Sequence, residues 1–246
     1  DLFDQMAQRG ALSADLMTAF IFFEILSFTS FTWVIHEENE AAIRAAKTYL
    51  AIAVIGGLLL FMGLLLLWHA AGTLEFSELK ASAAGASDQK EVFAAGVLIL
   101  FGFGAKAGMF PLHIWLPKAH PVAPAPASAL LSGILTKVGV YGILMTTVQA
   151  FAGNTVYGIL VLVLGTVTMA LGALLAVFSV NLKRTLACSS MSQIGSVGES
   201  SAWLYRTSKA ALNMAVAAAQ HDYPRATLVT IDPGWVRTDM GGENAP

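Results

Sequence analysis

Charged residues are scarce in this chain of 246 residues. Lys, Arg, Asp and Glu make up 12% of it and hydrophobic residues 56%, whereas about a quarter of an average soluble domain is charged. The formal net charge is −2, so we expect no basic surface for binding nucleic acid. The composition predicts a protein whose main partner is the lipid bilayer.

Three other features are lacking. The only cysteine, Cys188, can form no internal disulfide and has no metal-ligand spacing around it, so we expect it to pack in the core. The chain begins at Asp1 without an initiator Met or an apolar leader, which predicts no signal peptide and a missing amino-terminal part. No glycine-rich turn follows a strand, so we expect no bound cofactor, and we expect no bound metal either.

Long apolar stretches are abundant, and each is about as long as a membrane-crossing helix. They predict helices at Leu16 to Ile35, Tyr49 to Trp68, Val92 to Met109, Ser128 to Val148 and Val156 to Val180, with a sixth from about Asn181. Glu75 to Glu91 should be a polar loop, and four prolines between His113 and Ser128 should prevent a regular helix there. The predicted fold class is an all-α polytopic membrane protein with about five to six transmembrane helices, incomplete, followed by a short α/β remnant at the carboxyl terminus.

Basic residues are concentrated in alternate loops. Those after the first, third and fifth helices carry Arg44, Lys47, Lys118, Lys183 and Arg184. Because basic loops remain on the cytoplasmic side, we expect this end of the protein to face the cytoplasm.

Three ionisable residues fall inside the predicted membrane helices, namely Glu24, Lys106 and Lys137. A charge at mid-bilayer costs at least ~2.5–3.5 kcal/mol, so each needs a partner, a wet cavity or neutralisation. A Glu–Lys pair that forms and breaks would act as a proton switch. One alternative is that Lys106 extends from the end of its helix to the membrane surface. Another is that the chain is a structural membrane scaffold in which these ionisable residues are inert. His113 and His120 flank the proline-rich segment and could relay protons or simply cap backbone groups.

Three segments in the same order resemble a known family. FFEILSF, GAKAGMFPLHIWLPKAHPVAPAPASALLSGILTKVGVYG and NLKRTLACSSMSQIG are similar to the antiporter-like membrane subunits of complex I, of membrane-bound hydrogenases and of multisubunit sodium/proton antiporters. The resemblance implies that Glu24 and Lys106 form the switching pair and that Lys137 passes protons along the membrane plane. It also implies other membrane subunits as partners, in a bacterial or archaeal inner membrane. Members from complex I often have an acidic residue after WLP, whereas this chain has Lys118, so it is more similar to the hydrogenase members of the family.

A second resemblance begins near residue 195. GSVGESSAWLYRTSKAALNM and IDPGWVRTDMGG are similar to short-chain dehydrogenase/reductases, in which Tyr205 would be the acid/base and Lys209 would assist it and hold the cofactor ribose. Ser192 stands at the distance of that family's substrate serine, although its surroundings also fit the membrane pattern.

The two resemblances divide the chain into two predicted parts. Residues 1–195 would be a partial antiporter-like transmembrane domain and residues 196–246 a reductase fragment, joined between Ile194 and Val197. Because the dinucleotide-binding turn and the parallel sheet are missing, we expect the fragment to be inactive and to bind no NAD(P). The alternative is a short-chain NAD(P)-dependent oxidoreductase for which the helices are only an anchor.

Overall fold

The computed structural model describes residues 13–194, and nearly all of them are helical. The α-helices are α2 (Leu16–Ile35), α3 (Glu40–Ala71), α4 (Phe76–Gly85), α5 (Gln89–Ala107), α6 (Trp115–Val122), α7 (Ala125–Leu130), α8 (Thr136–Ala150), α9 (Thr155–Val177) and α10 (Leu182–Ile194). A 3-10 turn, η1 (Leu112–Ile114), precedes α6, and a π-helical turn, η2 (Leu131–Leu135), joins α7 to α8.

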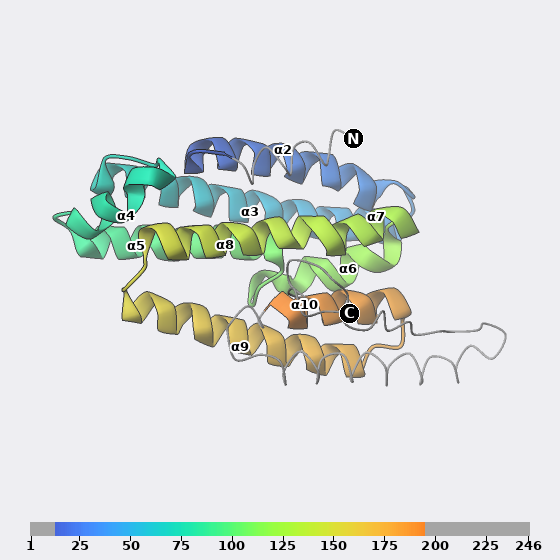
Figure 1. Ribbon diagram of the computed structural model, residues 1–246. Helices are drawn as coiled ribbons and strands as arrows, with labels where there is room; N and C mark the ends of the chain where they lie inside the picture. The colour runs from blue at the N-terminus through green and yellow to red at the C-terminus, as the bar shows by residue number, and fades with distance from the viewer. Residues whose placement is uncertain (1–12, 195–246) are drawn as a thin grey trace, which may run out of the picture.

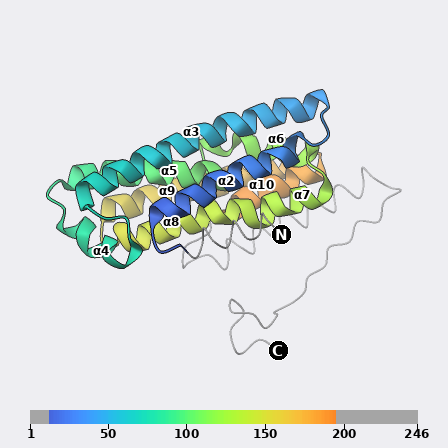
Figure 2. The same ribbon diagram turned by 90° about the horizontal axis from the view of Figure 1, so that it is seen from above.

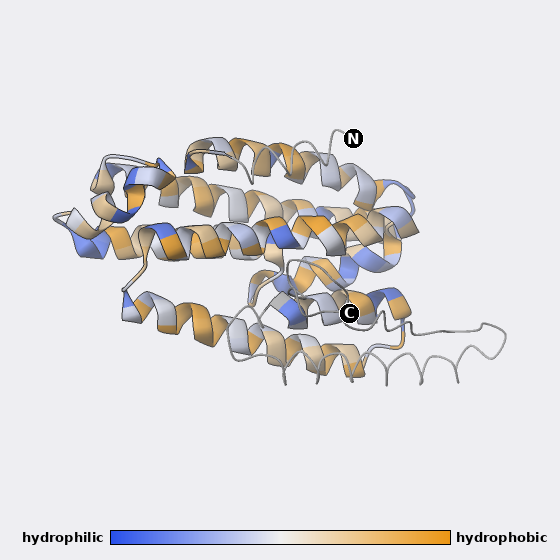
Figure 3. Ribbon diagram, in the orientation of Figure 1, coloured by the Kyte–Doolittle hydropathy of each residue, from blue (hydrophilic) through white to orange (hydrophobic). Residues whose placement is uncertain are grey.

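Five segments are long and apolar enough to cross a membrane. They are Leu16–Ile35, Glu40–Ala71, Gln89–Val122, Ala125–Ala150 and Thr155–Val177. Figure 3 shows hydrophobic residues along the long helices and hydrophilic ones mainly toward the ends of the bundle and in α4. The prediction of an all-α polytopic membrane protein is confirmed for the part of the chain that the structure describes.

The membrane-length helices lie roughly along one common direction (Figures 1 and 2). α3 packs along α5, and α5 also packs against α8, while α2 covers α3. α10 packs against both α9 and α6, and α6 also contacts α3. The amino-terminal end of α3, α6 and the start of α10 therefore meet at one end of the bundle, whereas α4 lies at the other (Figure 1).

The second helix is longer than the sequence predicted. α3 begins at Glu40, where the Asn39 side chain accepts a hydrogen bond of 2.8 Å from the amide of Ala42. The charged first turns are exposed on one side and bury Ala45 and Ala46 on the other. This segment is amphipathic, which is why its charges suggested a loop.

The polar stretch between α3 and α5 is also partly helical. It contains α4, a helix of 10 residues, where a loop was predicted. Leu79 and Ala83, four residues apart, are buried on its inner face. A single buried face is enough to hold a short helix of mixed composition against the bundle.

The proline-rich segment contains two short helices, α6 and α7, separated by a break at Ala123 and Pro124. No regular helix runs through the whole segment, as predicted, but the prolines do not prevent helix formation within it. Pro117 lies in the first turn of α6, where its missing amide proton costs no intrahelical hydrogen bond, and Pro121 lies near the end of that helix. Another interruption lies earlier, at Gly108, whose φ of 79° is in the left-handed region that favours glycine. The crossing at 89–122 therefore consists of two half-helices, α5 and α6.

Candidate functional site

Lys106 lies in the last turn of α5, just before the break, and its side chain is buried. The Nζ atom donates hydrogen bonds to Ser27 Oγ on α2 and, at 3.2 Å, to Tyr49 OH on α3. It also lies 5.0 Å from the centre of the Phe23 ring, within cation–π range. One ammonium group thus connects three helices of membrane length, and the Lys106 side chain is enclosed by the bundle.

Tyr49 connects the lysine to the half-helix beyond the break. Its hydroxyl is 2.5 Å from Ser30 Oγ, and its ring packs on the Trp115 ring with centroids 4.9 Å apart. Trp115 Nε1 in turn donates a hydrogen bond of 2.7 Å to the carbonyl of Ala105. Lys106, Tyr49 and Trp115 line a small cavity of about 10 Å³, which is close to the space one water molecule needs.

Glu24 is half-buried on α2, one turn before Ser27. Its carboxylate interacts electrostatically with Lys106, but Oε1 is buried without a hydrogen-bond partner among the described residues. The carboxylate lies against Gly57 of α3: a Cβ atom at that position would be 2.5 Å from Glu24 Oε1 and 2.9 Å from Cδ. Only glycine leaves room for the carboxylate in this position.

Lys137 lies elsewhere, on an exposed face of α8 that also carries Tyr141, Leu144 and Val148. The inner face of α8 meets α5 at Gly139, where a Cβ atom would be 2.6 Å from the amide nitrogen of Ala107. Lys137 is therefore at about the same level of the bundle as Lys106. The structure brings Glu24 and Lys106 into one cluster and places Lys137 on another face.

The two predicted relay histidines lie beyond the break. His120 of α6 is buried, and its Nδ1 is 2.7 Å from Ser128 Oγ of α7, whereas Nε2 has no partner among the described residues. The His113 ring in η1 stacks on Phe110, and its Nδ1 is likewise buried and unpartnered within residues 13–194. Buried polar atoms of this kind usually pair with another protein group or with ordered water.

The remaining predicted site residues belong to the carboxyl-terminal part. Ser192 is buried in α10, where its backbone packs closely against Gly172 of α9. Its Oγ has no hydrogen-bond partner in the described part of the chain. Tyr205 and Lys209 lie outside the described residues, as does all of the predicted reductase fragment.

Sequence reasoning missed three members of the cluster, Ser27, Tyr49 and Gly57. Ser27 had a detectable signal, since it follows Glu24 by three residues and so shares its helix face. Tyr49 and Gly57 are on α3, and their relation to Glu24 arises only when α2 packs on α3. No local pattern marks such positions.

The family of NADH:quinone oxidoreductase and Mrp antiporter transmembrane proteins matches residues 13–234 of the chain. This match continues past the boundary predicted at residue 195. Hydrogenase-4 component B of Escherichia coli (strain K12) is 38% identical over 178 residues, which are 71% of this chain and 26% of that protein. A Na(+)/H(+) antiporter protein of Alkalihalophilus pseudofirmus is 31% identical over 185 residues, 75% of this chain and 38% of its own length.

Solved structures show the same arrangement of helices. A chain in the Mrp complex from Dietzia sp. DQ12-45-1b has a TM-score of 0.72 and 25% identity, covering 89% of this chain and 42% of that one. A chain of the archaeal membrane-bound sulfane sulfur reductase has a TM-score of 0.73 at 24% identity, covering 89% of this chain and 46% of that one. The chain thus spans less than half the length of these relatives, and it belongs to the NADH:quinone oxidoreductase/Mrp antiporter transmembrane family.

Proposed function

We propose that the chain forms part of a proton-translocating, antiporter-like subunit of a respiratory NADH:quinone oxidoreductase or a related membrane-bound hydrogenase. The observation that carries this proposal is the Lys106 ammonium, buried between membrane helices, bonded to two hydroxyls, with the Glu24 carboxylate close by. Burying two opposite charges within a bilayer is costly. Such groups are retained where their charge is used.

The geometry supports a switch between two protonation states. Glu24 Oε1, which has no hydrogen-bond partner within residues 13–194, is available to accept a proton. Protonation would neutralise the carboxylate and remove the attraction that favours the charged form of Lys106. Lys106 could then release its proton into the cavity that it lines, and transfer of the proton from Glu24 to Lys106 would restore the starting state.

Lys137 is proposed to carry the proton onward, as the family resemblance implies. Its face of α8 is exposed in the described bundle, and a charge facing lipid would cost at least ~2.5 kcal/mol. We therefore propose that this face contacts water or another membrane subunit. We also propose His113 and His120 as relay groups. Both lie beyond the break at Gly108, toward the end of the bundle where α3 and α10 begin.

Replacing Lys137 separates this proposal from an inert scaffold. Introduced at the matching position of a full-length relative, Lys137→Ala should lower proton translocation by at least about tenfold, because it removes a proton carrier. Since Lys137 is exposed in the described bundle, the substitution leaves no cavity inside that bundle. Translocation would be measured with a pH-sensitive dye in vesicles, and assembly by native gel.

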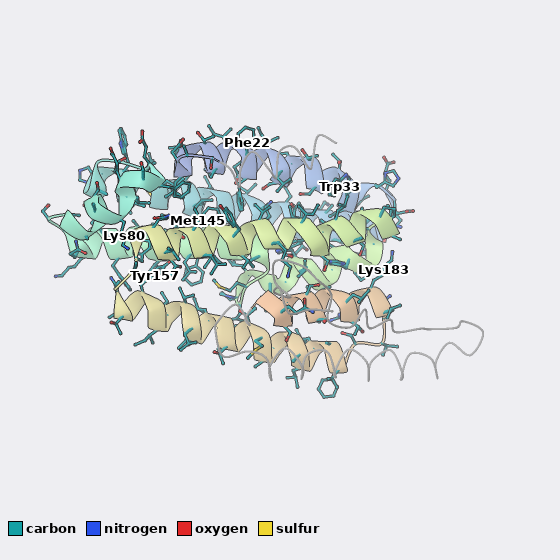
Figure 4. All side chains as sticks on the ribbon, in the orientation of Figure 1. Phe22, Trp33, Lys80, Met145, Tyr157 and Lys183 are labelled. Carbon is teal, nitrogen blue, oxygen red and sulfur yellow. The ribbon has the colours of Figure 1, made fainter. Side chains whose placement is uncertain are left out.

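Lys80→Ala is the matched control, because Lys80 is also exposed but lies in α4 at the opposite end from Lys183 (Figure 4). It should leave translocation unchanged. Full translocation by the Lys137→Ala protein would instead favour the scaffold.

From the motifs alone, we further propose that residues 196–246 derive from a short-chain dehydrogenase/reductase and are inactive. A free phenol has a pKa near ~10 and is a poor base at neutral pH, so Tyr205 would need Lys209 and a bound nicotinamide ribose to act. A dinucleotide pyrophosphate is held by amides of a glycine-rich helix start, and the sequence has no such turn after a strand.

The purified chain should therefore show no measurable NADH or NADPH binding by calorimetry and no carbonyl reduction. A complete reductase of the same family serves as the positive control. Saturable dinucleotide binding that is lost in a Lys209→Ala chain would make the membrane-anchored oxidoreductase the better assignment.

A further inference from the structure

A second hollow lies away from the cluster around Lys106, at the end of the bundle where the start of α3, α6 and the start of α10 meet. It has a volume of about 720 Å³, within the range of pockets that hold small ligands. It opens where α3 and α10 begin, and α6 forms one wall. Its charged lining residues are Arg44, Lys118 and Arg184, and no Asp or Glu is among its lining residues in the described part of the chain.

These three cations come from three different helices. Arg44 also forms an exposed ion pair of 3.2 Å with Glu40 on its own helix, but such a solvated pair is weak and occupies only one of the five guanidinium N–H donors. Lys118 and Arg184 are exposed at the mouth of the hollow. Like charges gathered without a lining carboxylate repel one another unless an anion lies between them.

Part of the wall is apolar, and its uncharged polar lining residues are Thr48, His113 and Asn181. Ile114, Pro117, Val122 and Leu175 line the apolar part, and Ile114 is 48% exposed. Leu175 adjoins the outer surface of α9, on which Leu174 and Val177 are 55% and 61% exposed. A bare inorganic anion makes no use of an apolar wall, whereas an amphiphile fits both the cations and the adjoining lipid-facing surface.

We propose that this hollow binds an anionic phospholipid, with its phosphate between Arg44, Lys118 and Arg184 and an acyl chain along Leu175 toward the exposed face of α9. The location fits, because the ends of membrane helices lie at the depth of lipid headgroups. This inference does not depend on proton transfer at Lys106.

The test compares headgroups on the unmodified chain. The chain, purified in a non-ionic detergent, would be mixed with phosphatidylglycerol or phosphatidylcholine bearing identical acyl chains, and bound lipid counted by native mass spectrometry. Phosphatidylglycerol should be retained at least about tenfold better, given roughly one kcal/mol per cationic contact. Equal retention of the two lipids would overturn the proposal.

Charge-neutralising variants locate the binding. Lys118→Gln and Arg184→Gln should each weaken phosphatidylglycerol retention by about fivefold, while Lys80→Gln at the opposite end should not (Figure 4). Both substituted side chains are exposed, and circular dichroism would verify the helical content. An equal loss in the Lys80→Gln chain would indicate unspecific attraction and contradict the assignment.

Inorganic phosphate separates the two sources of the anion. A large excess of phosphate should leave phosphatidylglycerol bound, because it offers nothing to the apolar wall. Complete displacement by phosphate would show a site for free anions and would overturn the lipid assignment.

Discussion

Glu24→Gln, introduced at the matching position of a full-length relative, should lower proton translocation by at least about tenfold while the protein still assembles. Glutamine has nearly the shape of glutamate, so the contact with Gly57 of α3 is kept. It cannot take up a proton, however, and cannot attract the Lys106 ammonium. The switch would lose the partner that changes charge.

The measurement requires both translocation in vesicles and the amount of assembled protein. Glu78→Gln is the control, because Glu78 is an exposed carboxylate on α4. It should translocate like the parent protein. A Glu24→Gln protein that assembles and translocates at the parent rate would remove Glu24 from the relay.

Gly57→Ala should have an effect of similar size without changing any charge. The new Cβ atom would occupy the space of the Glu24 carboxylate, 2.5 Å from Oε1. Because the carboxylate ends a flexible side chain, the helices can stay packed while the carboxylate moves. A displacement of about 1 Å in a reacting group can cost roughly 10²-fold in rate, so we expect translocation to fall at least about tenfold.

Gly56→Ala is the matched comparison on the neighbouring residue. Its Cβ atom would meet the Cβ of Ala105 at 2.6 Å and the carbonyl of Gly102 at 3.3 Å. These atoms cannot move without shifting α5, so that variant should mainly lower thermal stability and assembly.

A rescue experiment sharpens the distinction. Glu24→Asp combined with Gly57→Ala shortens the acid by one methylene and should recover part of the lost translocation. A Gly57→Ala protein with parent activity, or a double variant no better than Gly57→Ala alone, would contradict the positioning role of Gly57.

The sequence predicted the membrane helices well where an apolar run is bounded by polar residues. α2 was predicted with both ends correct, because Asp15 caps its first turn and accepts a hydrogen bond from the amide of Thr18 at 2.8 Å. The beginning of α3 and all of α4 were mistaken for loops. Both carry charges on an exposed side, and burial of the other side is decided by packing rather than by composition.

The candidate site was predictable only in its ionisable residues. Glu24 and Lys106 stand out because a charge inside an apolar run is costly, and they contribute to one cluster. Tyr49 and Gly57 look like ordinary residues of an apolar helix, and their roles depend on how α3 sits between α2 and α5. The exposed placement of Lys137 likewise depends on which faces of α8 its neighbours cover.

The π-helical turn at Leu131–Leu135 has a mechanical consequence for the crossing at 125–150. Its hydrogen bonds span one residue more than those of an α-helix, so this turn contains one more residue than an α-helical turn would. If that turn tightened to α geometry without loss of a residue, everything after it would rotate by about 100° relative to α7. Lys137, two residues past the turn, would then project in a different direction from the helix axis. Deletion of one residue within the turn would instead convert it to α geometry and keep the direction in which Lys137 projects.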